Sequence, residues 1–307
     1  MLGLCTLSRR AANKELNILV TGGSGFIGHH LTKYLLNRGH QVFNVDIASN
    51  KADERVDIRK FEELKKIFEL LKPDVVVHLA AIASIHQCEE DVDLCFETNV
   101  RGTLNVAVLC SKLGCKLVFA SSSAVYGEPV KVPTPVTHPL NPVNVYGLTK
   151  LLGERIVQYF CPSHVIFRIF NVYGPECYRS YVIPDIIRKI LAGHNPIPLQ
   201  GTGEEVRDFI YVEDVLEAFR MAIETPITGV FNLGSGKAYR IRDVVEMIID
   251  IMGVRGVGLK FEGKKRPGDF TMSWADISEG NGLLGWAPRF DIETGLRATI
   301  DWHLKSA

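Results

Sequence analysis

The sequence predicts an α/β protein in which helices cover both faces of a parallel β-sheet. Three observations lead to this prediction. Short apolar runs alternate with amphipathic segments of helical spacing through the first half of the chain, which is the order of βαβ units. A glycine-rich turn joins the first run, residues 18–20, to the first amphipathic segment. An acidic residue, Asp46, ends the second run. Together these features are typical of a doubly wound sheet of the Rossmann type.

The composition indicates a globular protein. The 307 residues are 46% hydrophobic and 23% charged, which suits two domains or one large α/β domain with an appendage. The 35 basic and 35 acidic residues cancel and neither kind clusters, so we expect no nucleic acid partner. No apolar stretch approaches the roughly 20 residues of a membrane span. We therefore expect a cytoplasmic protein without a membrane partner.

Cysteine and histidine usage indicates neither disulfides nor a metal site. The seven cysteines are an odd number without C-x-x-C spacing, which predicts reduced thiols that act as small apolar fillers. The nine histidines show no metal-ligand spacing. We therefore expect no metal.

The glycine-rich turn reads T-G-G-S-G-F-I-G, with glycines spaced G-x-x-G-x-x-G rather than G-x-G-x-x-G. Glycines at such a turn let backbone N–H groups approach a pyrophosphate, and the following helix N-terminus adds donors and partial positive charge. A lone glycine motif also occurs in turns that bind nothing, so its neighbours must decide. The residues of this turn expected at the cofactor are Gly22, Gly25, Phe26 and Ile27.

Asp46 indicates which dinucleotide would bind. It ends the run Q-V-F-N-V-D, about 20 residues past the turn, where an acid can accept both hydroxyls of the adenosine ribose. It would repel a 2′-phosphate, so it favours NAD over NADP; an exposed acid at a strand end is the alternative. In the next segment, V-D-I-R, Asp57 is expected to reach the adenine amino group while Ile58 packs on the ring.

The next units continue the pattern. Residues 60–71 form an amphipathic helix, and 74–79 form an apolar strand in which His78 is interpreted as a packed residue rather than a catalyst. The small side chains that follow leave room for a cofactor. On the largely apolar helix predicted over 92–113, Asn99 is a polar residue that we expect to bridge backbone and water near the site. The cofactor residues expected here are Leu79, Ala80, Ala81 and Asn99.

The chemical centre is predicted where the strand 116–120 runs into S-S-S-A-V-Y-G and where N-V-Y-G-L-T-K opens the helix 145–160. Tyr146 and Lys150 are four residues apart, so they share one helix face. A phenol is a poor base, with a free pKa of about 10, but a lysine cation and an oxidised nicotinamide favour the phenolate. With a serine from the strand end, this pair can take a proton from a sugar hydroxyl as hydride leaves its carbon.

With these motifs in this order, residues 16–302 resemble the extended short-chain dehydrogenase/reductase family, the sugar-nucleotide epimerases and dehydratases. The resemblance implies that Ser122, four residues before Tyr126, is the catalytic serine. It also implies that Tyr146 is the general base, and that Lys150 binds the cofactor ribose and tunes the tyrosine.

The two residues after Ser122 narrow the reaction. Family dehydratases carry an Asp-Glu pair there and decarboxylases a glutamate at the second position, whereas this chain has Ser123 and Ala124. This matches the 4-epimerases and implies NAD-dependent epimerisation at C4 of a UDP-hexose through a transient 4-keto sugar. The alternatives are an NAD-dependent nucleotide-sugar ketoreductase, an epimerase of another nucleotide sugar, and a non-catalytic NAD-binding protein.

The resemblance assigns the nucleotide sugar to the second half of the chain. Two arginines far apart in sequence suit a diphosphate that needs charge from two sides. A small residue four positions after Asp269, where a tyrosine restricts the pocket, implies that UDP-GlcNAc/UDP-GalNAc are substrates as well as UDP-glucose/UDP-galactose. Besides Ser122, the expected substrate residues are Asn171, Leu199, Arg207, Arg266, Asp269 and Ser273.

The predicted organisation has three parts. Residues 1–14 form a disordered leader, and 15–170 an NAD-binding Rossmann domain that carries Ser122, Tyr146 and Lys150. Residues 171–307 form a smaller α/β domain, mainly for the nucleotide sugar, with segments that can return to the sheet. The helices 92–113 and 145–160 have apolar faces beyond what one sheet needs, and the resemblance implies a homodimer through a four-helix bundle.

Overall fold

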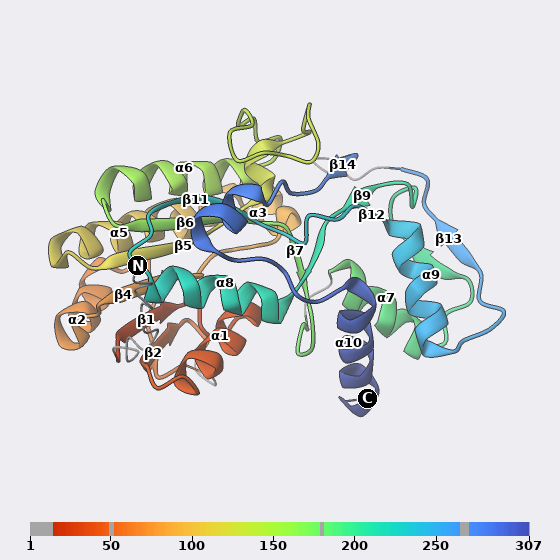
Figure 1. Cartoon of the computed structure of the whole chain (residues 1–307), viewed down its shortest axis with the longest axis horizontal. Coiled ribbons are helices and arrows are strands. Elements are labelled where there is room, and N and C mark those ends of the chain that lie inside the picture. Colours follow the sequence, from red (N-terminus) through yellow and green to blue (C-terminus); the bar gives the residue numbers. More distant parts are fainter. Residues whose placement is uncertain (1–14, 49–51, 179–180, 265–269, 307) are drawn as a thin grey trace, which may run out of the picture.

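The computed structural model describes residues 15–48, 52–178, 181–264 and 270–306. Its larger part is built on a seven-stranded sheet, on the left of Figure 1. The strands are β1 (Asn17–Thr21), β2 (Gln41–Asp46), β3 (Glu54–Arg55), β4 (Val75–His78), β5 (Lys116–Ser122), β6 (His164–Ile169) and β11 (Gly229–Leu233). All pairs are parallel, in the order β11-β6-β5-β4-β1-β2-β3. The predicted α/β fold class is confirmed, and the order reverses beside β1, the switch point at which such sheets bind ligands.

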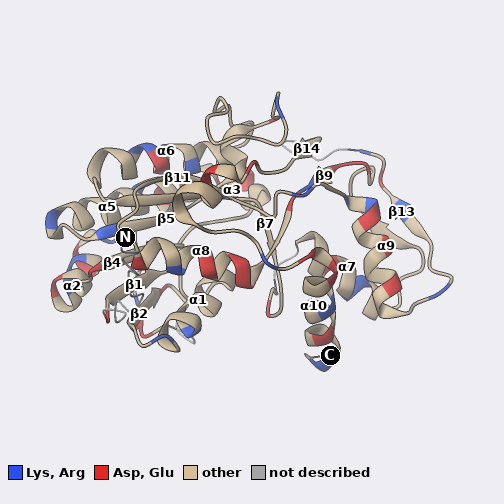
Figure 2. Ribbon diagram, in the orientation of Figure 1, with Lys and Arg blue, Asp and Glu red and all other residues tan. Residues whose placement is uncertain are grey.

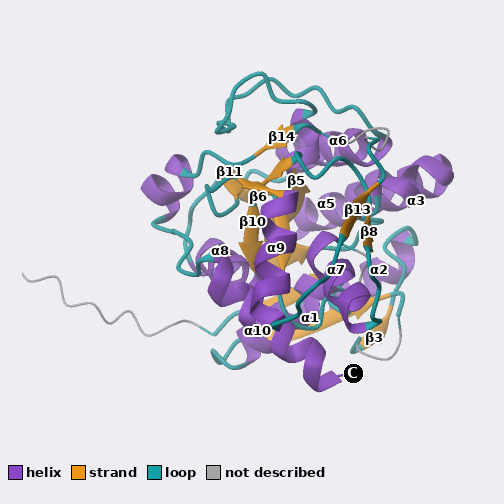
Figure 3. Cartoon of the chain, turned by 90° about the vertical axis from the view of Figure 1, so that its right-hand side faces the viewer, coloured by secondary structure: helices purple, strands orange, loops and turns teal. Residues whose placement is uncertain are grey.

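Helices cover both faces of this sheet (Figures 1 and 3). On one face lie α2 (Phe61–Leu71), α5 (Gly102–Leu113) and α6 (Val145–Phe160); on the other lie α1 (Phe26–Leu36) and α8 (Val212–Glu224). The central strands are therefore buried on both sides, which explains why they are continuous apolar runs.

The predicted helix 92–113 exists, but it is not a regular α-helix throughout. A short helix, α3 (Ile85–Glu90), precedes α4 (Val92–Phe96), and a π-helical turn, η1 (Glu97–Arg101), joins α4 to α5. Turns of this kind are frequent at functional sites. On the other side of the predicted centre, β5 ends in a 3₁₀ turn, η2 (Ser123–Tyr126).

The smaller part, on the right of Figure 1, is made of short strands and helices. The strand pairs are β7 (Asn171–Tyr173) with β10 (Phe209–Tyr211) and β8 (Ile197–Leu199) with β13 (Leu259–Phe261). A third sheet has the order β12 (Tyr239–Arg240), β9 (Val206–Arg207), β14 (Met272–Ser273). The helices are α7 (Val182–Leu191), α9 (Ile241–Met252) and α10 (Ile292–Ser306). The π turn η3 (Gly280–Leu284) returns to the larger part, where it contacts α8 and β11.

The prediction that every cysteine is a reduced thiol is wrong for one pair. Cys88 of α3 and Cys95 of α4 form a disulfide, with their Cα atoms 5.2 Å apart. Asp91 ends α3 and caps α4 by accepting a hydrogen bond from Leu94 N. This corner turns both cysteines inward, a pairing that the spacing of six intervening residues does not reveal. Cys110, Cys115 and Cys161 are buried thiols outside this disulfide, and Cys177 is buried as well.

Charges are mixed over the surface. Acidic residues (red) and basic residues (blue) are spread over both parts of the ribbon in Figure 2. Across the described residues, no helix is both long and apolar enough to cross a membrane. Within the same residues, no group of three or more metal-ligating side chains is arranged to hold a metal ion.

Candidate active site

The glycine-rich turn lies between the ends of β1 and β4 and the start of α1. Gly22 has a φ of +74°, and a Cβ built there would lie 2.5 Å from the backbone nitrogen of Ala80. Only glycine fits this approach. At Gly25, by contrast, a Cβ would meet a single atom within 4 Å, the Gly22 carbonyl oxygen at 3.3 Å. The turn is thus packed on one side against the segment that follows β4, and it is open at Gly25, where α1 begins without a side-chain cap.

Asp46 reaches this turn from the end of β2. Its carboxylate accepts hydrogen bonds from the backbone nitrogens of Ser24, at 3.0 Å, and Ala48, at 3.1 Å. The half-buried acid therefore lies at the rim of the turn. Uncapped helix N–H groups, an open glycine and an acid on the second strand match the pyrophosphate and ribose of NAD, so the residues present fit that cofactor.

Asp57 and Ile58 lie on the segment after β3. Both oxygens of Asp57 are engaged by Arg59 at 2.6–3.0 Å, and these hydrogen bonds lower the pKa of the carboxyl group. Ile58 is buried, with its side chain against Gly102 of α5. Their contact with adenine stays a prediction.

Leu79, Ala80 and Ala81 follow β4 and are half-buried. The loop after them is held by Asn99 of η1. The Asn99 side chain accepts a hydrogen bond from Ile82 N at 2.8 Å and donates to Ile82 O at 3.0 Å and to Thr149 Oγ1 at 3.1 Å. Because Asn99 is itself buried, we assign it to supporting this loop, and its contact with the cofactor stays a prediction.

His78 is a packed residue of β4, as predicted. Its Nδ1 is 2.7 Å from Thr21 Oγ1 and its Nε2 is 3.0 Å from Thr103 Oγ1. The Thr103 hydroxyl donates to Asn99 O at 2.5 Å, so it accepts from His78 Nε2. Burial lowers the pKa of His78 to about 3, which keeps the imidazole neutral.

Ser122 and Tyr146 belong to two elements that touch. Ser122 ends β5 and caps η2, its Oγ accepting from Ala124 N at 3.2 Å. Tyr146 lies in the first turn of α6, which Asn144 caps by accepting from Gly147 N at 2.7 Å. A Cβ at Gly147 would lie 2.6 Å from the Ala124 carbonyl oxygen. A side chain at position 147 would therefore push the start of α6 away from η2, so only glycine allows this close packing.

Lys150 lies one helical turn after Tyr146. Its Nζ is 5.9 Å from the centre of the Tyr146 ring and donates a hydrogen bond to Ala120 O at 2.8 Å. The side chain is only 4% exposed. Burial lowers the pKa of Lys150 to about 8, while Glu154 acts in the opposite direction. The lysine is therefore still mostly a cation at pH 7, beside the tyrosine that it is predicted to tune.

Two of the predicted substrate residues lie on paired strands of a small sheet. Arg207 of β9 lies in register with Ser273 of β14, and both are buried. The Arg207 guanidinium donates to Phe270 O at 2.8 Å and to Val206 O at 2.9 Å. The structure thus brings together an arginine and a small residue that are 66 positions apart in the chain (273 − 207).

Asn171 and Leu199 lie on strands β7 and β8. The Asn171 side chain donates to the backbone oxygen of Asp208 at 2.9 Å, while Leu199 is buried in the core. The Asp208 carboxylate is buried and accepts hydrogen bonds from the backbone nitrogens of residues 235, 236 and 275, which ties three segments together. Arg266 and Asp269 lie outside the described residues.

Three residues at the centre were not expected from the sequence: Gly147, Glu154 and Arg168. Glu154 and Arg168 form a buried ion pair, with Arg168 Nη2 2.8 Å from Glu154 Oε2. The available signal was the spacing Y-G-L-T-K-L-L-G-E, which puts an acid one further turn along the face of Lys150.

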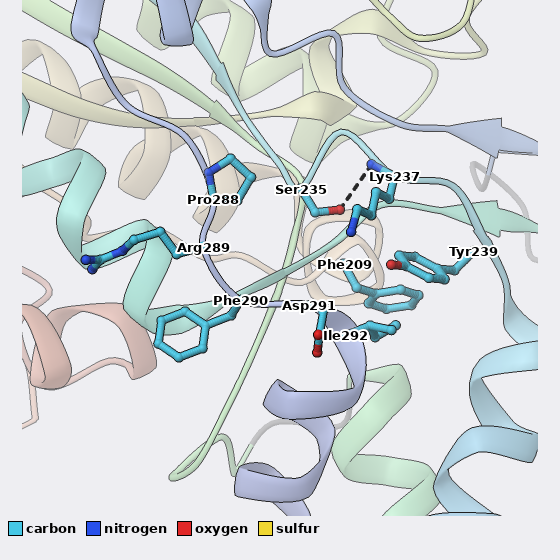
Figure 4. A pocket seen from close by; sticks show the side chains of 9 residues that line it. All are labelled: Phe209, Ser235, Lys237, Tyr239, Pro288, Arg289, Phe290, Asp291 and Ile292. Carbon is cyan, nitrogen blue, oxygen red and sulfur yellow. Dashed lines mark hydrogen bonds between the residues drawn. The ribbon is translucent and has the colours of Figure 1, made fainter.

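A surface depression of about 130 Å³ lies in the smaller part of the molecule (Figure 4). It is smaller than the roughly 300–1,000 Å³ of typical ligand sites, and it contains none of the predicted catalytic residues. Its lining residues are Phe209, Ser235, Lys237, Tyr239, Pro288, Arg289, Phe290, Asp291 and Ile292.

The chain is similar over nearly its whole length to known nucleotide-sugar enzymes. The structure of a Thermotoga maritima UDP-glucose 4-epimerase with UDP-glucose matches with a TM-score of 0.89 and 32% identity, covering 94% of this chain and 99% of that one. A UDP-N-acetylglucosamine 4-epimerase of Methanobrevibacter ruminantium, in complex with UDP-N-acetylmuramic acid, matches with a TM-score of 0.87 and 31% identity, covering 96% and 100%. A UDP-glucuronate 4-epimerase of Thermodesulfobacterium geofontis is 31% identical over 92% of this chain and 95% of its own.

The family model called NAD dependent epimerase/dehydratase family matches residues 18–234, the segment that runs from the glycine-rich turn through α6 to β11. That segment holds the open turn at Gly25, the acid on β2 and the tyrosine–lysine pair. The chain therefore belongs to the NAD dependent epimerase/dehydratase family and is an enzyme that uses NAD.

Proposed function

We propose that the protein epimerises C4 of a UDP-hexose through a transient 4-keto sugar, with Ser122, Tyr146 and Lys150 as its catalytic residues. The observation that carries the proposal is the contact between η2 and the first turn of α6, which joins the strand end of Ser122 to the helix of Tyr146. Ser123 and Ala124 follow the serine and neither is an acid, so the site is not equipped to remove water.

The proposed roles follow from these positions. NAD held at the glycine-rich turn would supply a reversible hydride acceptor for C4, so the reaction would involve no net oxidation. Tyr146 takes the proton of the C4 hydroxyl and later gives it back. The Lys150 cation beside the ring favours the phenolate. Ser122 donates a hydrogen bond to the same sugar oxygen.

We place the diphosphate at Arg207. Inversion requires the keto sugar to turn over while the nucleotide stays bound, and a guanidinium suits the phosphate oxygens for that purpose. Arg266 and Asp269 keep their sequence-based assignment to the second phosphate and the nucleotide ribose. The division into residues 15–170 for NAD and mainly 171–307 for the nucleotide sugar is part of the same proposal.

Ser273 supports a wide sugar site. A serine opposite Arg207 occupies little volume, so we propose UDP-glucose/UDP-galactose and UDP-GlcNAc/UDP-GalNAc as substrates. The similar enzymes named for UDP-glucose and UDP-N-acetylglucosamine fit this choice. The relative named for UDP-glucuronate makes that sugar the competing candidate.

The test is NMR of the purified protein with UDP-glucose, UDP-GlcNAc and UDP-glucuronate in separate tubes. We expect the C4 epimer of the first two without accumulation of NADH. Tyr146→Phe should lower turnover by about 100- to 10,000-fold, because the general base is lost, and should keep its bound NAD.

The matched control is Tyr159→Phe, since Tyr159 is on the same helix and 83% exposed; it should turn over like the wild type. Near-normal turnover by Tyr146→Phe would contradict the proposed base. Stoichiometric NADH would favour the ketoreductase, and no product from any sugar would favour a non-catalytic protein.

We also propose a homodimer that pairs the outer faces of α5 and α6 with those of a second copy. Leu104 and Val108 of α5 and Leu152 of α6 are half-exposed, and Leu148 is 39% exposed. Together with Tyr159 they form an apolar strip over two adjacent helices. Such a strip is common at interfaces and unusual on a monomer.

A further inference from the structure

The strand that carries Ser122, β5, is hydrogen-bonded to side chains of α6 at two successive residues. The backbone oxygen of Ala120 accepts a hydrogen bond from Lys150 Nζ at 2.8 Å. The next residue, Ser121, donates from its hydroxyl to Glu154 Oε1 at 2.5 Å. Ser122 follows directly. These two hydrogen bonds therefore set the position of α6 relative to the end of β5, immediately before the proposed catalytic serine.

Glu154 is held in place from a third element, β6. Arg168 donates from Nε to Glu154 Oε1 at 2.9 Å and from Nη2 to Glu154 Oε2 at 2.8 Å, a two-pronged contact. Glu154 is 0% exposed and Arg168 is 5% exposed. Because buried charges are costly unless paired, each of the two depends on the other.

The third guanidinium nitrogen of Arg168, Nη1, connects the ion pair to η2. Nη1 donates to the hydroxyl of Tyr126, at 3.1 Å, and to Val136 O, at 2.8 Å. The Tyr126 hydroxyl donates to Asn232 Oδ1 at 2.6 Å. Tyr126 belongs to η2, the turn that Ser122 caps. The ion pair thus contacts both sides of the junction between η2 and α6.

The charge of Glu154 also reaches Lys150. The ionisable groups facing that lysine are Tyr146 and Glu154 from its own helix and His78 from β4, and Phe119 of β5 lies under its Nζ. His78 is neutral because it is buried. Glu154 is therefore the anion that opposes the effect of burial on Lys150.

We propose that Glu154, with Arg168, is a positioning residue of the active site: it sets α6 against the end of β5 and places an anion one helical turn from Lys150. The inference rests on the proposed function for its catalytic meaning. The predicted effect of Glu154 on the titration of Lys150 does not depend on a nucleotide sugar, so it can be tested without substrate.

The first test compares Glu154→Gln with Glu154→Asp. Glutamine keeps the shape and loses the charge, whereas aspartate keeps the charge and withdraws it by one methylene. We expect kcat to fall by about 10- to 100-fold in both, since small misplacements of reacting groups cost this much, with KM changed by less than about 3-fold. In Glu154→Gln alone, the alkaline limb of the kcat profile should move to lower pH.

The second readout is NMR of ¹³C-labelled lysine, with the Lys150 signal assigned from the spectrum of Lys150→Met. Lys150 should titrate at lower pH in Glu154→Gln than in the wild type, and at nearly the wild-type pH in Glu154→Asp. This measurement needs no nucleotide sugar. An inactive wild type would thus refute the proposed function and leave this inference open to test.

Two further variants cover the case in which Glu154→Gln does not fold because Arg168 is left unpaired. The double variant Glu154→Gln/Arg168→Met removes both charges, and Ser121→Ala removes only the hydroxyl; both should lower kcat while bound NAD stays at the wild-type level. Glu217→Gln breaks a partly buried pair with Arg220 on α8 and should change neither readout. Wild-type kcat in folded Glu154→Gln or Ser121→Ala, or an unchanged Lys150 titration in Glu154→Gln, would overturn the inference.

Discussion

Single residues decide how much room the proposed sugar site has. Ser273 lies beside Arg207 across two paired strands, so a larger side chain at this position would take space next to the proposed phosphate ligand. We therefore propose that the volume of this one side chain sets the choice between sugars with and without an N-acetyl group.

We predict that Ser273→Tyr lowers kcat/KM for UDP-GlcNAc at least about 10-fold more than for UDP-glucose, which corresponds to roughly 1.4 kcal/mol of discrimination. Parallel progress curves on the two substrates measure the ratio. The control is Ser278→Tyr, since Ser278 is exposed on the same segment. Equal losses on both sugars, with bound NAD retained, would contradict the role of Ser273.

At the scale of elements, β4 and the start of α5 are joined through a neutral histidine. His78 is hydrogen-bonded between Thr21 of β1 and Thr103 of α5, and its pKa is about 3 when folded against about 6.5 in an unfolded chain. Between these values the unfolded chain binds a proton that the folded protein does not. Stability from this group is therefore complete above about pH 6.5 and is lost as the pH falls toward 3.

We predict that at pH 5 the wild type has lost about 2 kcal/mol of its free energy of unfolding through His78, relative to pH 7. The variant His78→Asn should be less stable at pH 7, and the gap to the wild type should narrow at pH 5. Urea unfolding at both pH values measures it. The exposed His86→Asn is the control and should follow the wild type. A gap that does not change with pH would refute the assignment.

At the scale of the whole molecule, the outer faces of α5 and α6 form an apolar surface that a partner could cover. These helices bury their inner faces against the sheet, through residues such as Val106 and Val157, and keep apolar side chains on the outside. A second copy that offers the same faces would bury both strips in a symmetric interface.

We predict that the wild type has a mass of twice 34.2 kDa by light scattering and that Leu148→Glu shifts it toward 34.2 kDa. A carboxylate in the middle of the strip would have to be buried in the dimer without a partner. The control is Leu70→Glu, because Leu70 is 76% exposed but lies on α2, away from the strip. A monomeric wild type would rule out the proposed bundle.

The fold class, the glycine-rich turn and the position of the tyrosine–lysine pair could be predicted from the sequence because they depend on local pattern. Apolar runs mark the strands of a buried parallel sheet. Spacing of four puts Tyr146 and Lys150 on one helix face whatever surrounds them. Glycine spacing marks a turn that a side chain would block, which the short distance between Gly22 and Ala80 explains.

Only the tertiary structure decided which of these parts meet and what holds them. The Ser121–Glu154 and Glu154–Arg168 contacts join residues 33 and 14 positions apart on three elements, and the Cys88–Cys95 disulfide crosses a corner between two helices. The sequence pattern predicts Asn99 as a cofactor residue, yet its side-chain amide is hydrogen-bonded to Ile82 and Thr149. The physical reason is that spacing reports which face a side chain occupies, whereas its partner depends on how the elements pack.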